Sequence, residues 1–112
     1  MAGLWLVFRV IGSVLTVPLA EELAFRGYVL SRLGGQQPGT GEPLAFSWFA
    51  LIGSAVIFGL LHDAWVAGII AGLAYGWVRY YRDRLSDAVV AHATTNLMLF
   101  VYAAATGQWS VW

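Results

Sequence analysis

The run LAFSWFALIGSAVIFGLL at residues 44–61 decides the fold, because it contains no charged residue. A stretch of this length is close to the roughly 20 apolar residues that a helix needs to cross a bilayer. Three other segments are similarly apolar: residues 2–19, residues 64–77 and residues 85–105. The first of them continues toward residue 33, and the second needs residues 78–81 to reach spanning length. We therefore predict an all-α fold, a polytopic transmembrane helical bundle with about four spans.

The composition supports a lipid environment and excludes several kinds of chemistry. Hydrophobic residues make up 60% of the 112 residues and charged residues 11%, with a mean hydropathy of +0.72. Soluble domains average about 45–50% apolar and about 25% charged residues. The net charge is zero, so no nucleic-acid partner is indicated. With no cysteine, the chain has neither a thiolate nucleophile nor a disulfide.

The connections predict an up-and-down bundle forming one domain over residues 1–112. Residues 34–43 (GGQQPGTGEP) form a loop, and the other turns are very short. This topology places the loop and the Arg-rich turn near Arg82 on one face. The positive-inside rule makes that face cytoplasmic, so we expect a multi-pass integral protein of the cytoplasmic membrane. Gly68, Gly72 and Gly76 share one helix face and should allow a close helix contact.

Six polar residues interrupt these apolar segments, where a central charge costs at least about 2.5–3.5 kcal/mol. They are Glu21, Glu22, Arg26, His62, His92 and Asn96. One interpretation is a polar plug that holds the bundle together, and the i,i+4 pair of Glu22 and Arg26 fits it. Successive helical residues point about 100° apart, however, so Arg26 can neutralise only one glutamate and Glu21 is left over. At about 1.5 Å per residue, Glu21, His62, His92 and Asn96 reach similar depths from three spans, which favours a site.

These four residues have the chemistry of a peptidase. A carboxylate and an imidazole, Glu21 and His62, can remove a proton from water as it attacks a carbonyl group. A second imidazole and an amide, His92 and Asn96, can donate hydrogen bonds to the developing oxyanion. Glu22 and Arg26 would then hold the first helix in position. Signatures of zinc, aspartyl and serine proteases are not present in the sequence.

Three short motifs give the chain a family resemblance. EELAFR at 21–26, FGLLH at 58–62 and HATTN at 92–96 resemble the EExxxR, FxxxH and HxxxN motifs of the CPBP or Abi family, which includes type II CAAX prenyl endopeptidases. The resemblance implies a membrane peptidase with Glu21 and His62 activating water and with His92 and Asn96 at the oxyanion. The run VPLAEELAFRGYVL and the tail ATGQWSVW also resemble exosortase-associated CAAX protease-related proteins. Family members usually carry helices before the first motif, so a core fragment of a larger bundle is an open alternative.

Two other functions stay open. A metal-dependent membrane protease would bind zinc through Glu21, His62 and His92, but their spacing is not that of helical metal ligands, so we expect no cofactor. A non-catalytic scaffold or bacteriocin-immunity protein would use the polar residues only for structure. For the peptidase, the expected partners are the lipid bilayer and a peptide or protein substrate, with a lipidated C-terminus as one option. The oligomeric state does not follow from the sequence.

Overall fold

The computed structural model describes residues 2–40 and 42–109, and every regular element within them is helical. One long helix covers Ala2–Leu33 and contains α1 (Ala2–Ile11), α2 (Val17–Ala24) and α3 (Leu30–Leu33), joined by the π-helical turns η1 (Gly12–Thr16) and η2 (Phe25–Val29). The helices α4 (Trp48–Leu60), α5 (Trp65–Arg82) and α6 (Leu85–Thr106) complete the fold. The predicted all-α bundle is confirmed, and its four apolar segments correspond to these four helices.

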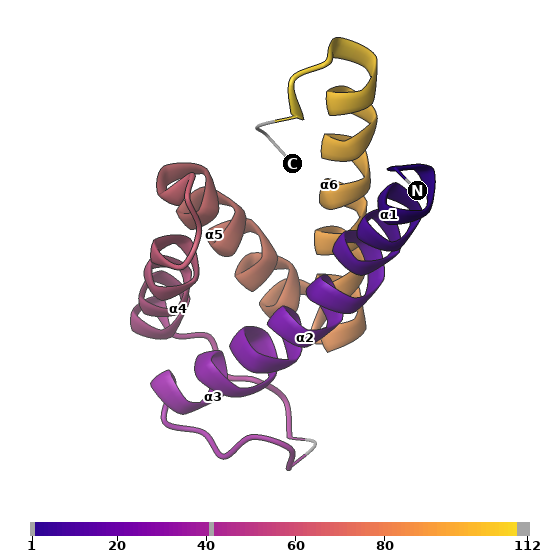
Figure 1. The fold of residues 1–112 in the computed structure, drawn as a ribbon. Helices are drawn as coiled ribbons and strands as arrows, with labels where there is room; N and C mark the ends of the chain where they lie inside the picture. The colour runs from indigo at the N-terminus through magenta and orange to yellow at the C-terminus, as the bar shows by residue number, and fades with distance from the viewer. Residues whose placement is uncertain (1, 41, 110–112) are drawn as a thin grey trace.

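The helices run up and down (Figure 1). The long helix packs against α6 through η1 and α2 and against α4 through α3 and η2, while α4 and α5 form an antiparallel pair. The loop after α3 and the turn between α5 and α6 meet at one end, where the Leu44 N–H donates to Asp83 Oδ1 at 3.4 Å. The predicted common face for the loop and the Arg-rich turn is therefore confirmed.

Small residues let α4 and α5 approach closely. A Cβ atom at Gly68 would lie 2.9 Å from the Cα of Gly59, and one at Gly72 would lie 3.0 Å from the Cα of Ala55. Real side chains do not tolerate backbone atoms at such distances, so larger residues would push the helices apart. The predicted glycine contact is confirmed, with α4 as the partner helix.

The outer faces of the bundle are strongly apolar. No residue of α1 is buried, and Phe8 and Phe49 are 66% and 71% exposed. Ala2–Leu33 and Leu85–Thr106 are long and apolar enough to cross a membrane, and Trp48–Leu60 is apolar but shorter. Exposed apolar surface on this scale is costly in water and suits contact with lipid chains.

The interior combines an aromatic core with buried charges. Phe25, Phe58 and Tyr75 form the core, and the Phe25 and Phe58 rings meet edge to face at 5.2 Å. The fully buried side chains include Arg26 and Glu22. Because a buried charge is stable only when it is paired and hydrogen-bonded, the polar contacts at this centre determine how the helices fit together.

Candidate active site

Glu22 is the centre of a buried ion cluster between the long helix and α6. Its Oε2 atom accepts hydrogen bonds from Arg26 Nη1 at 3.0 Å and from His92 Nδ1 at 2.9 Å. The side chains of Glu22 and Arg26 are 0% exposed and that of His92 is 6% exposed. The predicted i,i+4 pairing is confirmed. The sequence did not indicate that His92 would contact the same carboxylate.

Arg26 connects this cluster to α5. Its Nη2 atom donates to the Gly72 carbonyl at 2.7 Å. The guanidinium carbon lies 4.6 Å from the centre of the Phe58 ring and 5.4 Å from that of Tyr75. Cations over aromatic faces are stabilised, and the planar guanidinium can stack and donate several hydrogen bonds at once. Arg26 thereby holds three helices around one charge.

Glu21 points to a different neighbour, as the 100° rotation between successive residues requires. Its Oε2 atom lies 3.5 Å from His62 Nε2, and the two side chains are 28% and 37% exposed. Although the side chain is partly exposed, this oxygen is itself shielded from solvent, and among the described residues it has no hydrogen-bond partner. On the other side of the imidazole, His62 Nδ1 lies 2.6 Å from the Phe58 carbonyl. The acid and the imidazole predicted to act together therefore face each other in a partly accessible position.

Asn96 contacts the backbone of the long helix. Its Nδ2 atom donates to the Ser13 carbonyl at 2.6 Å in a partly buried position. Asn96 lies one helical turn after His92, so both side chains lie on the face of α6 that is directed toward the long helix. The contact with the Ser13 carbonyl was not predicted from the sequence.

Both histidines contact the ring of Phe58. The centre of this ring is 4.5 Å from that of His62 and 5.7 Å from that of His92. The four predicted residues thus form two parts: Glu21 with His62, and His92 with Asn96. Adjacent glutamates of one helix connect the parts, because Glu21 faces His62 while Glu22 binds His92.

Tyr75 is a site neighbour that the sequence motifs did not reveal. Its ring stacks on the His92 imidazole, with centroids 4.7 Å apart and planes at 18°. The one sequence feature that could have indicated this role is its position between Gly72 and Gly76, where α5 packs closely against a neighbouring helix. Stacking on one side and the Glu22 bond at the ring edge together fix the orientation of His92.

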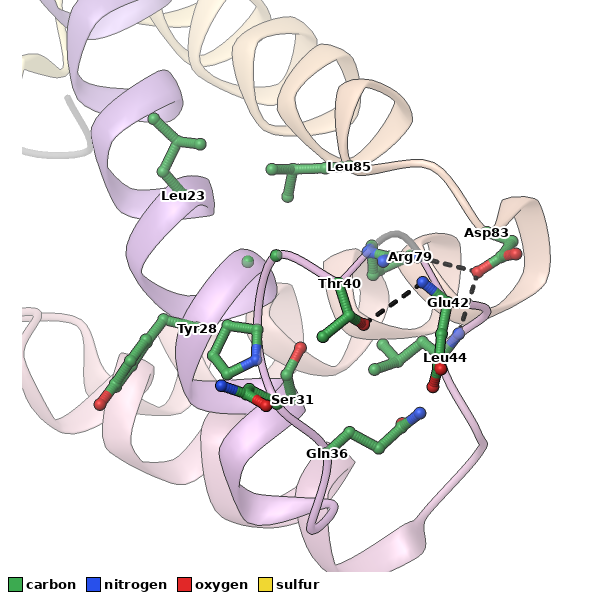
Figure 2. A pocket seen from close by; sticks show the side chains of 14 residues that line it. Leu23, Tyr28, Ser31, Gln36, Thr40, Glu42, Leu44, Arg79, Asp83 and Leu85 are labelled. Atoms are coloured by element: carbon green, nitrogen blue, oxygen red, sulfur yellow. Dashed lines mark hydrogen bonds and ion pairs between the residues drawn. The ribbon is translucent and has the colours of Figure 1, made fainter.

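A cavity of about 550 Å³ lies on the loop side of the bundle, away from these residues. Figure 2 shows it between the long helix, the loop after α3 and the ends of α5 and α6, with Tyr28, Thr40, Arg79 and Leu85 among its lining residues. Arg79 is paired there with Asp83 at 3.2 Å. None of the four candidate catalytic residues lines this cavity.

The described residues offer no ready metal centre. Within residues 2–40 and 42–109, no three His, Asp or Glu side chains lie together in a way that could hold a metal ion. The Nδ1 atoms of both histidines are already hydrogen-bonded to protein oxygens. The zinc alternative therefore finds no three-ligand set in this part of the chain.

The fold and this site define a class: helical membrane proteins with an acid–imidazole pair and a second imidazole inside the bundle. Residues 3–98 match a family model that is described as type II CAAX prenyl endopeptidase Rce1-like. The match covers most of the chain, which therefore belongs to this family of membrane-embedded peptidases. Membership implies a lipid bilayer environment and a peptide substrate. No curated protein and no solved structure matches the chain significantly.

Proposed function

We propose that the chain is an endopeptidase that uses its own side chains, without a metal ion, to hydrolyse a peptide bond at the membrane. Glu21 and His62 would activate water, and His92 and Asn96 would stabilise the oxyanion. The observation that carries the proposal is the 3.5 Å separation between Glu21 Oε2 and His62 Nε2.

The hydrogen bond on the far side of His62 determines what this pair can bind. The Phe58 carbonyl can only accept, so His62 Nδ1 is the donor in their 2.6 Å contact. A neutral His62 then presents the lone pair of Nε2 to Glu21. Two acceptors 3.5 Å apart repel each other unless a hydrogen is donated to them, and we propose that the attacking water is the molecule that donates it.

The proposed reaction uses this arrangement directly. The water oxygen attacks the carbonyl carbon of the substrate, and one of its protons passes to the Glu21–His62 pair. The tetrahedral intermediate then expels the amine, which takes the proton back as the C–N bond breaks. The products are a carboxylic acid and an amine, and the pair returns to its starting protonation state.

His92 would have to act as an imidazolium in this mechanism. Its Nδ1 proton is committed to Glu22, so Nε2 can donate to an oxyanion only when both ring nitrogens carry protons. The Glu22 carboxylate accepts from that ring at 2.9 Å, although it also pairs with Arg26. Asn96 has a second amide hydrogen besides the one given to Ser13, and it would be the other donor.

Cleavage of a farnesylated, fluorescence-quenched CAAX peptide by the purified chain in nanodiscs tests the proposal. Glu21→Gln is expected to lower kcat by about 10²–10⁴, the usual contribution of a general base. Glu42→Gln applies the same change in the loop and should leave kcat unchanged. Membrane insertion and thermal stability of each variant are measured in parallel.

The assay also separates the alternatives. Full activity in both Glu21→Gln and His62→Ala would overturn the assignment and favour a non-catalytic scaffold. Activity lost after treatment with a chelator and restored by zinc would favour the metal-dependent alternative. Comparing the farnesylated peptide with its unprenylated counterpart shows whether the substrate must be lipidated, which we propose on the basis of the family.

A further inference from the structure

The carbonyl of Ser13 lacks the partners that a regular helix would supply. In an α-helix it would accept from the N–H of Val17, but that N–H donates to the Gly12 carbonyl across the π-helical turn η1. In the π-helical register it would accept from residue 18, which is proline and has no N–H. Neither helical register can therefore satisfy this oxygen.

Asn96 supplies the missing donor from α6. Its 2.6 Å bond joins the Ser13 carbonyl to the amide one turn beyond His92. Inside a bilayer an unsatisfied carbonyl is costly, and prolines are tolerated in membrane helices because neighbouring helices bind the carbonyls they release. The π-helical turn before Pro18 and the Asn96 amide therefore depend on each other.

We propose that Pro18 is a positioning residue for Asn96: by withholding its N–H it keeps the Ser13 carbonyl free to orient the amide. This inference rests on the proposed catalytic role of Asn96. Pro18 is fully buried in the first turn of α2, three residues before Glu21. It thus connects the helix that carries the acid to the helix that carries the oxyanion donors.

The sequence allows a direct test, because Asn96 is its only asparagine. Cell-free synthesis with [15N]asparagine would give one side-chain NH₂ signal, whose hydrogen exchange can be followed in nanodiscs. Pro18→Ala restores an N–H that, continuing the π-helical register in which Val17 donates to Gly12, would compete with Asn96 for the Ser13 carbonyl. We expect exchange to become about five- to tenfold faster, the factor that corresponds to one hydrogen bond. Pro38→Ala makes the same substitution in the loop and should change nothing.

Kinetics provide the second measurement. A misplaced oxyanion donor should lower kcat about tenfold or more, with KM changing by no more than roughly threefold. A purely structural defect would instead reduce the amount of folded protein without this split. Exchange that is unchanged in Pro18→Ala, or faster exchange with unchanged kcat, would overturn the inference. The inference would also be overturned if the Asn96 amide of the unmodified chain exchanged as fast as that of free asparagine. This outcome can be measured even if the Pro18→Ala variant does not fold.

Exchange does not require turnover, so the two proposals can fail separately. A chain that shows a protected amide released by Pro18→Ala, but no peptidase activity, would count against the proposed function. The inference that Pro18 leaves the Ser13 carbonyl free to bind Asn96 would still stand.

Discussion

Replacing Glu22 by leucine tests whether the buried ion cluster holds the bundle together. Glu22 Oε2 accepts one charged hydrogen bond from Arg26 at 3.0 Å and one from His92 at 2.9 Å, with both carboxylate and guanidinium 0% exposed. Without the carboxylate, the Arg26 charge stays buried with the Gly72 carbonyl as its acceptor. Breaking a buried pair in this way costs about 3–5 kcal/mol.

A double-mutant cycle isolates the pair itself. Arg26→Met should be about as destabilising as Glu22→Leu, because it strands the opposite charge. The double variant removes both charges and should lose less stability than the sum of the two, with a coupling energy of about 2–3 kcal/mol. Unfolding by SDS titration in mixed micelles, followed by helical circular dichroism, measures all four proteins.

Glu21→Gln is the matched comparison within the same cycle. This side chain is 28% exposed and its facing oxygen has no hydrogen-bond partner among the described residues, so its loss should change stability by less than about 1 kcal/mol. Two results would refute the reasoning about the cluster. One is a free energy of unfolding for Glu22→Leu within about 0.5 kcal/mol of that of the unmodified chain, and the other is a double variant whose loss equals the sum of the two single losses.

The packing, the topology and the second imidazole each give one more prediction. Gly59→Ala should destabilise the bundle by about 1–3 kcal/mol, because the added Cβ would lie 2.6 Å from the backbone N of Ile69, whereas Gly3→Ala, with nothing within 4 Å and a gain in helix propensity, should not destabilise it in the same titration. Cysteine is absent from the chain, so a single cysteine at Thr40 should react with an impermeant maleimide only after the cells are opened, and labelling in intact cells would invert the proposed orientation. 15N NMR of a variant with His92 as its sole histidine reports whether both ring nitrogens carry protons, and a ring that carries only one would remove His92 as an oxyanion donor in the proposed mechanism.

Much of the fold could be predicted from hydropathy. Lipid selects for long apolar segments, so the four runs found in the sequence correspond closely to the helices, and the glycines of α5 do meet a neighbouring backbone. The pairing of Glu22 with Arg26 was predictable too, because residues four apart share one face of a helix. These features depend on local spacing, which the sequence states directly.

The unpredicted contacts depend on the relative rotation of helices. Two π-helical turns, η1 and η2, shift the register of the long helix on either side of Glu21 and Glu22. Each such turn rotates the residues after it about the helix axis, so a regular periodicity could not show that His92 would meet Glu22. The bond of Asn96 to a backbone carbonyl has no sequence signal of its own, because its partner is an atom that every residue carries. Only Pro18, which removes a donor, could have pointed to it.

The adjacent glutamates explain how one short helix can combine rigidity with reactivity. A catalytic carboxylate in a membrane must be accessible to water, but an accessible charge gives little stability. A buried ion pair can fix the helix in place, but a carboxylate held by two donors is poorly suited to take a proton. In this chain Glu22 carries the structural contacts and is fully buried, whereas Glu21 lies beside His62 in a partly accessible position. Because the two residues are neighbours, any movement of the buried pair displaces the proposed acid as well. The rotation of about 100° between them is what separates the two environments.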